Sequence, residues 1–262
     1  MTDMTSGTPA FTPGLVSIIT PAYNAAAFLE ETVRSAQAQT YTNWEMIIVD
    51  DCSTDSTVEL VKRLQKDDPR IRLIRRKQNG GPARAWNTAF RVMRGQYAAF
   101  LDSDDLWTPE KLAHQLAFME SHHYGFTYGS YDWIDEHSEA LDKTIRIPDH
   151  QNYRDMLMNS VIGALTVVID RSIYEIPQIP PAQINDSMLW LTLAKSGAEA
   201  YGLQEIIGHY RIASNSFSRN KGNAAKGLWV LYRDYLKLPL PKRVWYFSGY
   251  AVNALKRYAP FS

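Results

Sequence analysis

Three carboxylates fall within four residues in the segment Asp102-Ser103-Asp104-Asp105, which directly follows the apolar run from Tyr97 to Leu101. Such crowding of negative charge calls for a cation, and carboxylate oxygens are ligands that suit Mg²⁺ or Mn²⁺. A divalent ion held there could neutralise the two phosphates of a nucleotide diphosphate. The competing interpretation is an acidic turn that only caps the next helix.

A second acidic segment, Asp50-Asp51-Cys52-Ser53-Thr54-Asp55, follows another apolar run in the same way. Carboxylates in this position accept hydrogen bonds from a base N–H or a ribose hydroxyl, as acids do in dinucleotide-binding folds. Capping of the following helix accounts for Asp55 or Ser56, but it leaves Asp50 and Asp51 unexplained. We therefore expect Asp51 to contact a ligand.

The runs before these segments are predicted to be buried parallel strands, because they are β-branched, mostly apolar and of strand length. The predicted strands are 15–20, 44–49, 71–74 and 97–101, and the predicted helices between them are 28–36, 56–64 and 82–93. Ser56 and Glu59 suggest a capping box at the second helix. Alternating strands and helices indicate an α/β sheet covered on both faces, whose ligands lie at the carboxyl ends of the strands. Both acidic segments lie at that edge.

The second half of the chain is more mixed. Thr108-Pro109-Glu110 is typical of a helix start, and Gly197 is expected to end a helix that covers 186–195. Further strands are predicted near 126–131, 165–169 and 206–212, and a proline-rich loop at 177–181.

Composition limits the classes of protein that the chain can belong to. Its 262 residues are 45% hydrophobic and 21% charged, which predicts an ordered globular protein of one or two domains. The 28 basic and 28 acidic residues balance, which argues against attraction of the whole protein to nucleic acid. A single cysteine, Cys52, excludes an internal disulfide or a thiolate zinc cluster and fits a reducing cytoplasm. We expect no targeting signal in 1–14 and no membrane span, since the longest nearly apolar stretch, 161–169, is too short.

The last 34 residues differ from the rest in composition. Nine aromatic residues are interleaved there with six basic ones and only one acid, Asp234. Aromatic and basic side chains together suit the headgroup region of an anionic membrane. The alternative is a pair of amphipathic helices, broken at Pro239 and Pro241, that pack on the domain or on a second subunit. The sequence leaves both open.

Four segments, taken together, resemble the inverting family 2 glycosyltransferases of the GT-A fold. They are residues 16–24 (VSIITPAYN), 49–57 (VDDCSTDST), 79–84 (NGGPAR) and 100–107 (FLDSDDLW). Within the family the chain is most similar to bacterial enzymes that build teichuronic acid, O-antigen or capsule polysaccharide. The resemblance implies a Rossmann-like, mostly parallel sheet with helices on both faces, followed by a C-terminal helical extension.

The expected organisation follows from this resemblance. Residues 1–14 would be a flexible tail and 15–223 the catalytic domain. In that domain, 15–107 would bind the nucleotide sugar and 108–223 the acceptor. Residues 224–262 would form the helical extension.

The resemblance also assigns nucleotide-binding residues. Tyr23 corresponds to the aromatic side chain that packs on the nucleotide base, although ordinary packing under the sheet edge is an alternative, and Pro21 and Ala22 line the same turn. Asp51 corresponds to the acid that recognises the base, usually uracil.

In the acidic segment, Asp102 matches the family's ribose-binding or metal-linked acid. Ser103, the next residue, is assigned to the nucleotide-binding site. Asp104 matches the last acid of the DxD motif and would ligate Mn²⁺ or Mg²⁺.

One departure from the family lies in the third segment. Members commonly carry an arginine where this chain has Trp86, while Arg84 lies two residues earlier. Residues two apart on a helix face different directions, so a nucleotide-binding role for Arg84 competes equally with a solvated helix residue.

Asp186 is the candidate catalytic base. It lies in Asn185-Asp186-x-x-Leu189, which resembles the family's acid-acid-x-x-Leu segment at a helix start. Because Asn185 replaces the usual first acid, we expect the pKa of Asp186 to be less raised than with two adjacent acids. The alternative role is that of an N-cap aspartate.

The segment His209-Tyr210-Arg211 resembles the family's Tyr-Arg segment before a mobile loop, here 213–223. Arg211 would hold the diphosphate, and His209 would approach the metal, although a lone histidine is more often structural.

These observations predict a cytoplasmic, metal-dependent inverting glycosyltransferase that moves a sugar from a nucleotide diphosphate, expected to be UDP, to a glycan or lipid-linked acceptor of a bacterial surface polysaccharide. A nucleotide-sugar dehydrogenase or a nucleotidyltransferase on a related α/β sheet is an alternative enzyme, and the dehydrogenase is disfavoured because the turn after the first strand lacks Gly-x-Gly-x-x-Gly. A catalytically silent, ligand-binding subunit is the other alternative. Oligomeric state stays open.

Overall fold

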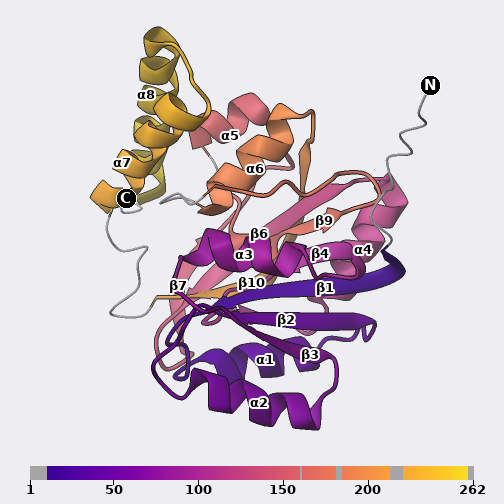
Figure 1. Cartoon of the computed structure of the whole chain (residues 1–262). Helices are drawn as coiled ribbons and strands as arrows, with labels where there is room; N and C mark the ends of the chain where they lie inside the picture. Colours follow the sequence, from indigo (N-terminus) through magenta and orange to yellow (C-terminus); the bar gives the residue numbers. More distant parts are fainter. Residues whose placement is uncertain (1–10, 160, 181–184, 213–220, 259–262) are drawn as a thin grey trace, which may run out of the picture.

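The apolar runs of the first hundred residues become neighbouring strands of one sheet (Figure 1). The computed structural model describes residues 11–159, 161–180, 185–212 and 221–258. The strands are β1 (Thr12–Ala22), β2 (Trp44–Asp50), β3 (Ile71–Arg75), β4 (Gly95–Phe100), β5 (Leu106–Trp107), β6 (Phe126–Ile134), β7 (Ala140–Ile145), β8 (His150–Gln151), β9 (Val168–Asp170) and β10 (Ala200–Arg211). The helices are α1 (Leu29–Gln37), α2 (Thr57–Asp67), α3 (Pro82–Phe90), α4 (Lys111–His122), α5 (Tyr153–Asn159), α6 (Asn185–Lys195), α7 (Lys221–Val230) and α8 (Leu240–Tyr258).

The sheet is mostly parallel and has the strand order β3-β2-β1-β4-β9-β6-β10-β5, with β7 beside β6 and β8 beside β10. Parallel pairing joins β3, β2, β1 and β4, and it also joins β6 to β10. The short strand β9 runs antiparallel to both β4 and β6. Because β9 reverses direction between them, β4 and β6 point the same way, and the carboxyl ends of all six parallel strands lie at one edge.

Side chains alternate between the two faces of the sheet and build a core on each. Ile18 of β1 and Ile48 of β2 face the core under α1, α2 and α4. Ile19 and Ile47 face the opposite core, under α3 and α6. The predicted α/β sheet with helices on both faces is confirmed (Figure 1).

Several predicted boundaries differ from the structure. β1 begins at Thr12, which pairs with Gly95, so the last residues of the expected tail are part of the sheet. α4 begins at Lys111 without a side-chain cap, whereas Thr108 was expected to start it. Ser56 precedes α2 but its side chain makes no capping bond. Asp55 caps α2 instead, because its Oδ1 accepts the backbone N–H of Thr57 at 3.0 Å.

The C-terminal extension is a helical hairpin that stands beside α5 and α6 (Figure 1). α7 begins at Lys221, before the expected boundary at 224, and continues into a π-helical turn at Leu231–Tyr235. α8 then packs along α5. None of the helices in the described part of the chain is long and apolar enough to cross a membrane.

Candidate active site

The loops after β1 and β2 are fastened to each other by short polar side chains. The backbone N–H of Asn24 donates to Ser53 Oγ at 2.9 Å, and Asn24 Oδ1 accepts the backbone N–H of Thr54 at 2.9 Å. Asn24 adopts a left-handed backbone (φ 49°), which an asparagine tolerates better than most residues. We call this pair of loops, residues 23–25 and 53–57, the β1–β2 clasp.

Tyr23 stands at the start of the clasp with 52% of its surface exposed, so its ring is free to receive a flat partner. This position disagrees with the alternative of ordinary packing under the sheet edge. Pro21 and Ala22 are the last residues of β1, opposite Val49 and Asp50 of β2. The structure thus places all three where the base-binding turn is expected, and their contact with a base stays a prediction.

Asp51 is 3% exposed, and protein groups already hold its carboxylate. Its Oδ2 accepts the backbone N–H groups of Gly80 (3.0 Å) and Gly81 (2.7 Å), and its Oδ1 forms an ion pair with Arg76. Gly81 has a φ of 80°, a conformation that glycine adopts readily. Asp51 therefore fastens the loop before α3 to the sheet edge, a role that the sequence did not suggest; recognition of a base stays a prediction.

The acidic segment after β4 carries an unbalanced negative charge. Burial, together with the carboxylates of Asp104 and Asp186, raises the pKa of Asp102 to about 7. Burial also raises the pKa of Asp104, against the lowering effect of Arg211, and it raises that of Asp105 well above its usual value. Asp105 Oδ2 is buried and receives no hydrogen bond from any described residue. The charges repel one another in a partly dry site, so a cation there would be stabilising.

Asp186 reaches the same site from the other half of the chain. It lies in the first turn of α6, and its charge contributes to the raised pKa of Asp102. Burial raises the pKa of Asp186 itself, while the backbone N–H of Ser187, 2.7 Å from its Oδ1, works in the opposite direction. The structure therefore brings together three of the expected site residues, Asp102, Asp104 and Asp186.

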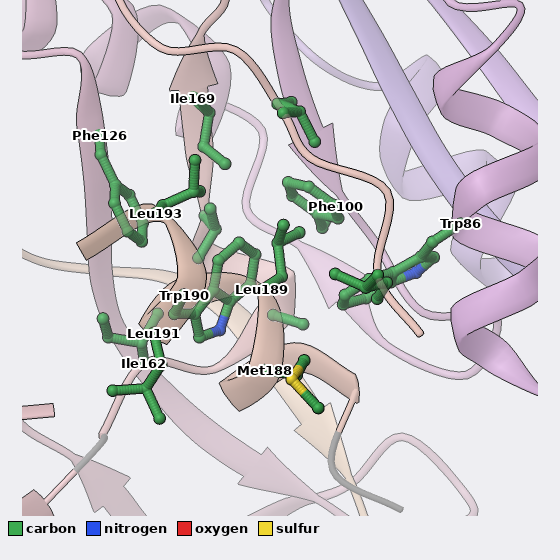
Figure 2. Packing of buried hydrophobic residues seen from close by; sticks show 14 of the residues in the cluster. Trp86, Phe100, Phe126, Ile162, Ile169, Met188, Leu189, Trp190, Leu191 and Leu193 are labelled. Carbon is green, nitrogen blue, oxygen red and sulfur yellow. The ribbon is translucent and has the colours of Figure 1, made fainter. Parts of the chain in front are cut away.

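Large aromatic side chains hold α6 against the sheet (Figure 2). Trp190 is completely buried, with its ring 5.1 Å from that of Phe100 on β4 and 5.5 Å from that of Phe126 on β6. Trp86, which replaces the family's arginine, joins this packing at 5.0 Å from Phe100 and 6.1 Å from Trp190. Trp86 thus supports the helix that carries Asp186.

Arg84, two residues before Trp86, is exposed on α3, next to Gly80. This position agrees equally with a solvated residue and with the predicted contact to the nucleotide. Ser103 is half-buried between Asp102 and Asp104.

Arg211 is fully buried and is engaged by protein acceptors. Its guanidinium donates to the backbone oxygens of Asp104 (2.7 Å) and Asp135 (3.0 Å), to Ser138 Oγ (2.9 Å) and to Glu31 Oε2 (2.8 Å). It also lies 4.7 Å from the ring centre of Phe28. Arg211 therefore positions the backbone that presents Asp104, and binding of the diphosphate, which stays a prediction, would require some of these bonds to be exchanged.

His209 is paired with Asp132 through its Nδ1. It lines a pocket of about 560 Å³ between α1, β5 and the turn after β6, on the face of the sheet opposite α6. Within the described ranges, no three His, Cys, Asp or Glu side chains converge to hold a metal ion, so His209 and Asp104 do not form such a group. Metal binding by His209 stays a prediction.

The residues that hold Arg211 and His209 were not predicted from the sequence. Glu31, Asp132, Asp135 and Ser138 come from α1, β6 and the turn after it. Asp132 directly follows the strand predicted near 126–131, but none of the four residues lies in a recognisable motif, so only the fold identifies them. Residues 213–220 of the expected mobile loop lie outside the described part of the chain, and its last three residues, 221–223, belong to α7.

A mostly parallel sheet with helices on both faces and acids at its carboxyl edge is the architecture expected of the GT-A fold. Solved structures agree: S. aureus TarS in complex with UDP-GlcNAc matches with a TM-score of 0.67 and 17% identity over 92% of this chain and 72% of that one. The mannosyltransferase PcManGT from Pyrobaculum calidifontis, in complex with GDP-Man and Mn²⁺, matches with a TM-score of 0.66 and 18% identity over 94% and 76%.

The chain belongs to glycosyl transferase family 2, whose model matches residues 17–172. The putative teichuronic acid biosynthesis glycosyltransferase TuaG of Bacillus subtilis is 43% identical over 93% of this chain and 97% of its own length. WfgD of Escherichia coli, named as a UDP-Glc:alpha-D-GlcNAc-diphosphoundecaprenol beta-1,3-glucosyltransferase, is 37% identical over 94% and 95%. The predicted family and fold are confirmed.

Proposed function

We propose that the chain transfers a sugar from a UDP-sugar, with inversion, to a lipid-linked saccharide during synthesis of a bacterial surface polysaccharide. The observation that carries the proposal is the meeting of Asp186 with Asp102 and Asp104 at the carboxyl edge of the sheet. The names of the full-length relatives TuaG and WfgD support the polysaccharide and the lipid-linked acceptor. The single cysteine, Cys52, fits a reaction in the reducing cytoplasm.

Asp186 is assigned the role of general base. A carboxylate whose pKa is raised by burial accepts a proton more readily than an exposed one, and such a base contributes about 10²- to 10⁴-fold to the rate. As the acceptor hydroxyl loses its proton to Asp186, its oxygen attacks the anomeric carbon from the side opposite the nucleotide. The bond from that carbon to the diphosphate breaks in the same step, which inverts the configuration.

The carboxylates of the acidic segment are suitable ligands for a divalent cation. Mg²⁺ and similar ions bind through one or two carboxylates together with substrate phosphates, so the lack of a three-ligand group among the described residues is compatible with such a site. Asp104, with Asp102 beside it, would hold Mn²⁺ or Mg²⁺, and the unbalanced charge of the acidic segment is the observation that favours this. When bound, the ion would stabilise the charge that develops on the leaving diphosphate.

Donor binding and turnover test the proposal separately. Thermal unfolding with UDP, GDP, dTDP or CMP, each with and without Mn²⁺, identifies the donor nucleotide, because a ligand that binds the native state stabilises it. We expect a shift with UDP that is largest when Mn²⁺ is present. A shift with GDP alone would contradict the choice of donor.

Turnover is measured with UDP-glucose and a GlcNAc-diphosphate-lipid, the substrates named for WfgD, followed by other UDP-sugars. Asp186→Asn should keep the UDP-dependent thermal shift and lose about 10²- to 10⁴-fold in rate. Lys195→Ala, at an exposed position in the last turn of the same helix, is the control and should keep most of the activity. Equal rates for Asp186→Asn and the wild type would remove Asp186 as the base, and binding of UDP without transfer of any sugar would favour the silent-subunit alternative.

A further inference from the structure

α8 has one face that is packed and one that is not. On the packed side, Tyr246, Phe247 and Tyr250 lie against the core under α5 and α6. Gly249 allows close approach to α5, since a Cβ at this position would lie only 3.2 Å from Met158 Cγ. Asn253 Nδ2 donates to the backbone oxygen of Met158 at 3.4 Å. These contacts fix the rotation of α8 about its axis.

The opposite side of α8 exposes large apolar side chains to solvent. Their exposed fractions are 56% for Leu240, 51% for Val244, 62% for Trp245 and 52% for Val252. Leu240, Val244 and Val252 are separated by multiples of four residues, so they lie on one face, and Trp245 borders them. We call these four residues the outer stripe. Large apolar side chains that are exposed together on one face of a helix are typical of interaction sites in soluble proteins.

The charge around the outer stripe is positive. α8 contains two lysines and two arginines and no acid. Lys237 and Lys242 are exposed at its start. Asp234, the only acid after residue 228, is already paired with Arg233 at 2.6 Å. A partner that covers the stripe must therefore be apolar in its interior and negative at its surface, as an anionic bilayer is.

A second copy of the chain fits this surface less well than a bilayer does. A two-fold contact through the outer stripe would place the same patch of each copy face to face. Lys237 and Lys242 of the two copies would then approach each other with no acid on α8 to compensate. An interfacial helix needs no such compensation, because its apolar face enters the acyl region while its lysines meet anionic headgroups, and tryptophan is enriched at that boundary.

We propose that α8 docks the protein on an anionic membrane surface through the outer stripe. This inference rests on the proposed function in one respect: a membrane-bound position gives access to a lipid-linked acceptor. The packing order adds a consequence, because α8 packs on α5 and α5 packs on α6, whose first turn carries Asp186 (Figure 1). Docking through α8 therefore sets the orientation of the proposed base relative to the bilayer.

The test is sedimentation of the full chain with vesicles of phosphatidylglycerol and phosphatidylcholine in equal parts, compared with vesicles of phosphatidylcholine alone. The stripe variant is Val244→Ser, Trp245→Ser and Val252→Ser together. The matched control is Ile173→Ser with Ile206→Ser, which removes two apolar side chains that are 49% and 44% exposed outside α8. Far-UV circular dichroism and thermal unfolding establish that all variants are folded.

We expect the wild type and the control to bind the anionic vesicles and the stripe variant to bind at least tenfold more weakly. Lys237→Glu with Lys242→Glu should weaken binding by about fivefold for each lysine removed, and salt should reduce wild-type binding. Unchanged binding by the stripe variant would overturn the proposal. Absence of wild-type binding would also overturn it, and a dimer in sedimentation velocity that the stripe variant abolishes would then assign the surface to a second copy.

Sugar transfer distinguishes failure of this inference from failure of the proposed function. With a short-chain, water-soluble acceptor the stripe variant should be as active as the wild type, while its transfer to an acceptor embedded in vesicles should fall. If no variant transfers sugar to either acceptor but the wild type still binds anionic vesicles through the stripe, the proposed function fails and the docking surface stands.

Discussion

The two edges of the central sheet use carboxylates in opposite ways. At the amino edge, Glu45 of β2 is buried, which alone would raise its pKa, but hydrogen bonds from Arg94, Ser17 and Arg72 hold that pKa below its usual value. At the carboxyl edge, Asp102 and Asp105 have raised pKa values because burial and neighbouring acids outweigh every partner.

Asp51 departs from this pattern at the carboxyl edge, because Arg76 and two backbone amides hold it. The acids that stabilise this fold, such as Glu45 and Asp51, thus have their hydrogen-bond and ion-pair partners within the protein. The acids proposed for catalysis and metal binding have too few partners to balance their negative charge, so their pKa values are raised, which is typical of functional sites.

Removal of Glu45 should have the largest effect on stability. Its carboxylate accepts bonds from Ser17 Oγ (2.8 Å), Arg72 (2.6 Å) and Arg94 (2.9 Å), so Glu45→Ala removes the acceptor of the buried Ser17 hydroxyl and of the partly buried Arg72 guanidinium. We expect a loss of about 4 kcal/mol in the free energy of unfolding, measured by urea denaturation. UDP binding by the folded fraction should be unchanged. A stability equal to that of the wild type would contradict the stabilising role of Glu45.

Arg211 is the cation that links the carboxyl edge to α1. Arg211→Gln removes charged hydrogen bonds to Glu31, Ser138 and two backbone oxygens, and should cost about 3 kcal/mol. Because the Arg211 charge opposes the raised pKa of Asp104, the variant should also bind UDP with Mn²⁺ more weakly, as measured by calorimetry. Glu31→Gln, which removes only one exposed partner, is the control; an equal loss in both variants would contradict the positioning role.

The pH dependence of stability should have opposite slopes at the two edges. Hydrogen bonds from Arg70 lower the pKa of Asp68, before β3, to about 2. Asp68 is therefore ionised in the folded chain where it is protonated in the unfolded one, and stability of about 2 kcal/mol is lost as pH falls from 4 to 2. Asp68→Asn should remove this loss.

Asp102, with a pKa of about 7, behaves in the reverse sense. Between pH 4 and 7 it is protonated in the folded chain and ionised in the unfolded one, so stability falls as pH rises through this window. Asp102→Asn should flatten that part of the curve. Denaturation curves from pH 3 to 8 measure both slopes, and a steeper fall in Asp102→Asn would contradict the raised pKa.

The smallest expected effect is an increase in stability, on substitution of Asp105. Asp105 Oδ1 accepts the backbone N–H of Arg211 at 2.9 Å, a bond that an asparagine oxygen can keep, while the buried Oδ2 has no hydrogen-bond partner among the described residues. Asp105→Asn should therefore raise the free energy of unfolding at pH 8 by about 1 kcal/mol. A loss of stability on this substitution would show that the acidic segment is already balanced in the free protein.

The sequence predicted those parts of the site that depend on local order. Apolar runs followed by acids placed Asp51 and Asp102 at one edge, because parallel strands end together. α6 was expected at 186–195 and is found at Asn185–Lys195, since its caps and apolar residues are adjacent in the chain. Contacts between distant elements were beyond such reasoning.

Trp86 and Arg211 illustrate what was missed. Trp86 was interpreted only as a lost arginine, because its partners Phe100 and Trp190 come from two other elements. The diphosphate role of Arg211 stays a prediction, but its contacts with Glu31, Ser138 and two backbone oxygens were missed, because these partners are distant from it in the chain. For α8 the amphipathic pattern was visible, but which face α5 covers depends on packing.

The β1–β2 clasp has a thermodynamic consequence. Its hydrogen bonds between Asn24, Ser53 and Thr54 are complete before any ligand arrives, so these loops are preorganised and little conformational entropy remains to be lost on binding. The β1–β2 clasp around Tyr23 can thus bind the donor without rearranging. Loosening it, for example by Asn24→Gly, would make recognition of the donor entropically costlier even though no group that touches the nucleotide has changed.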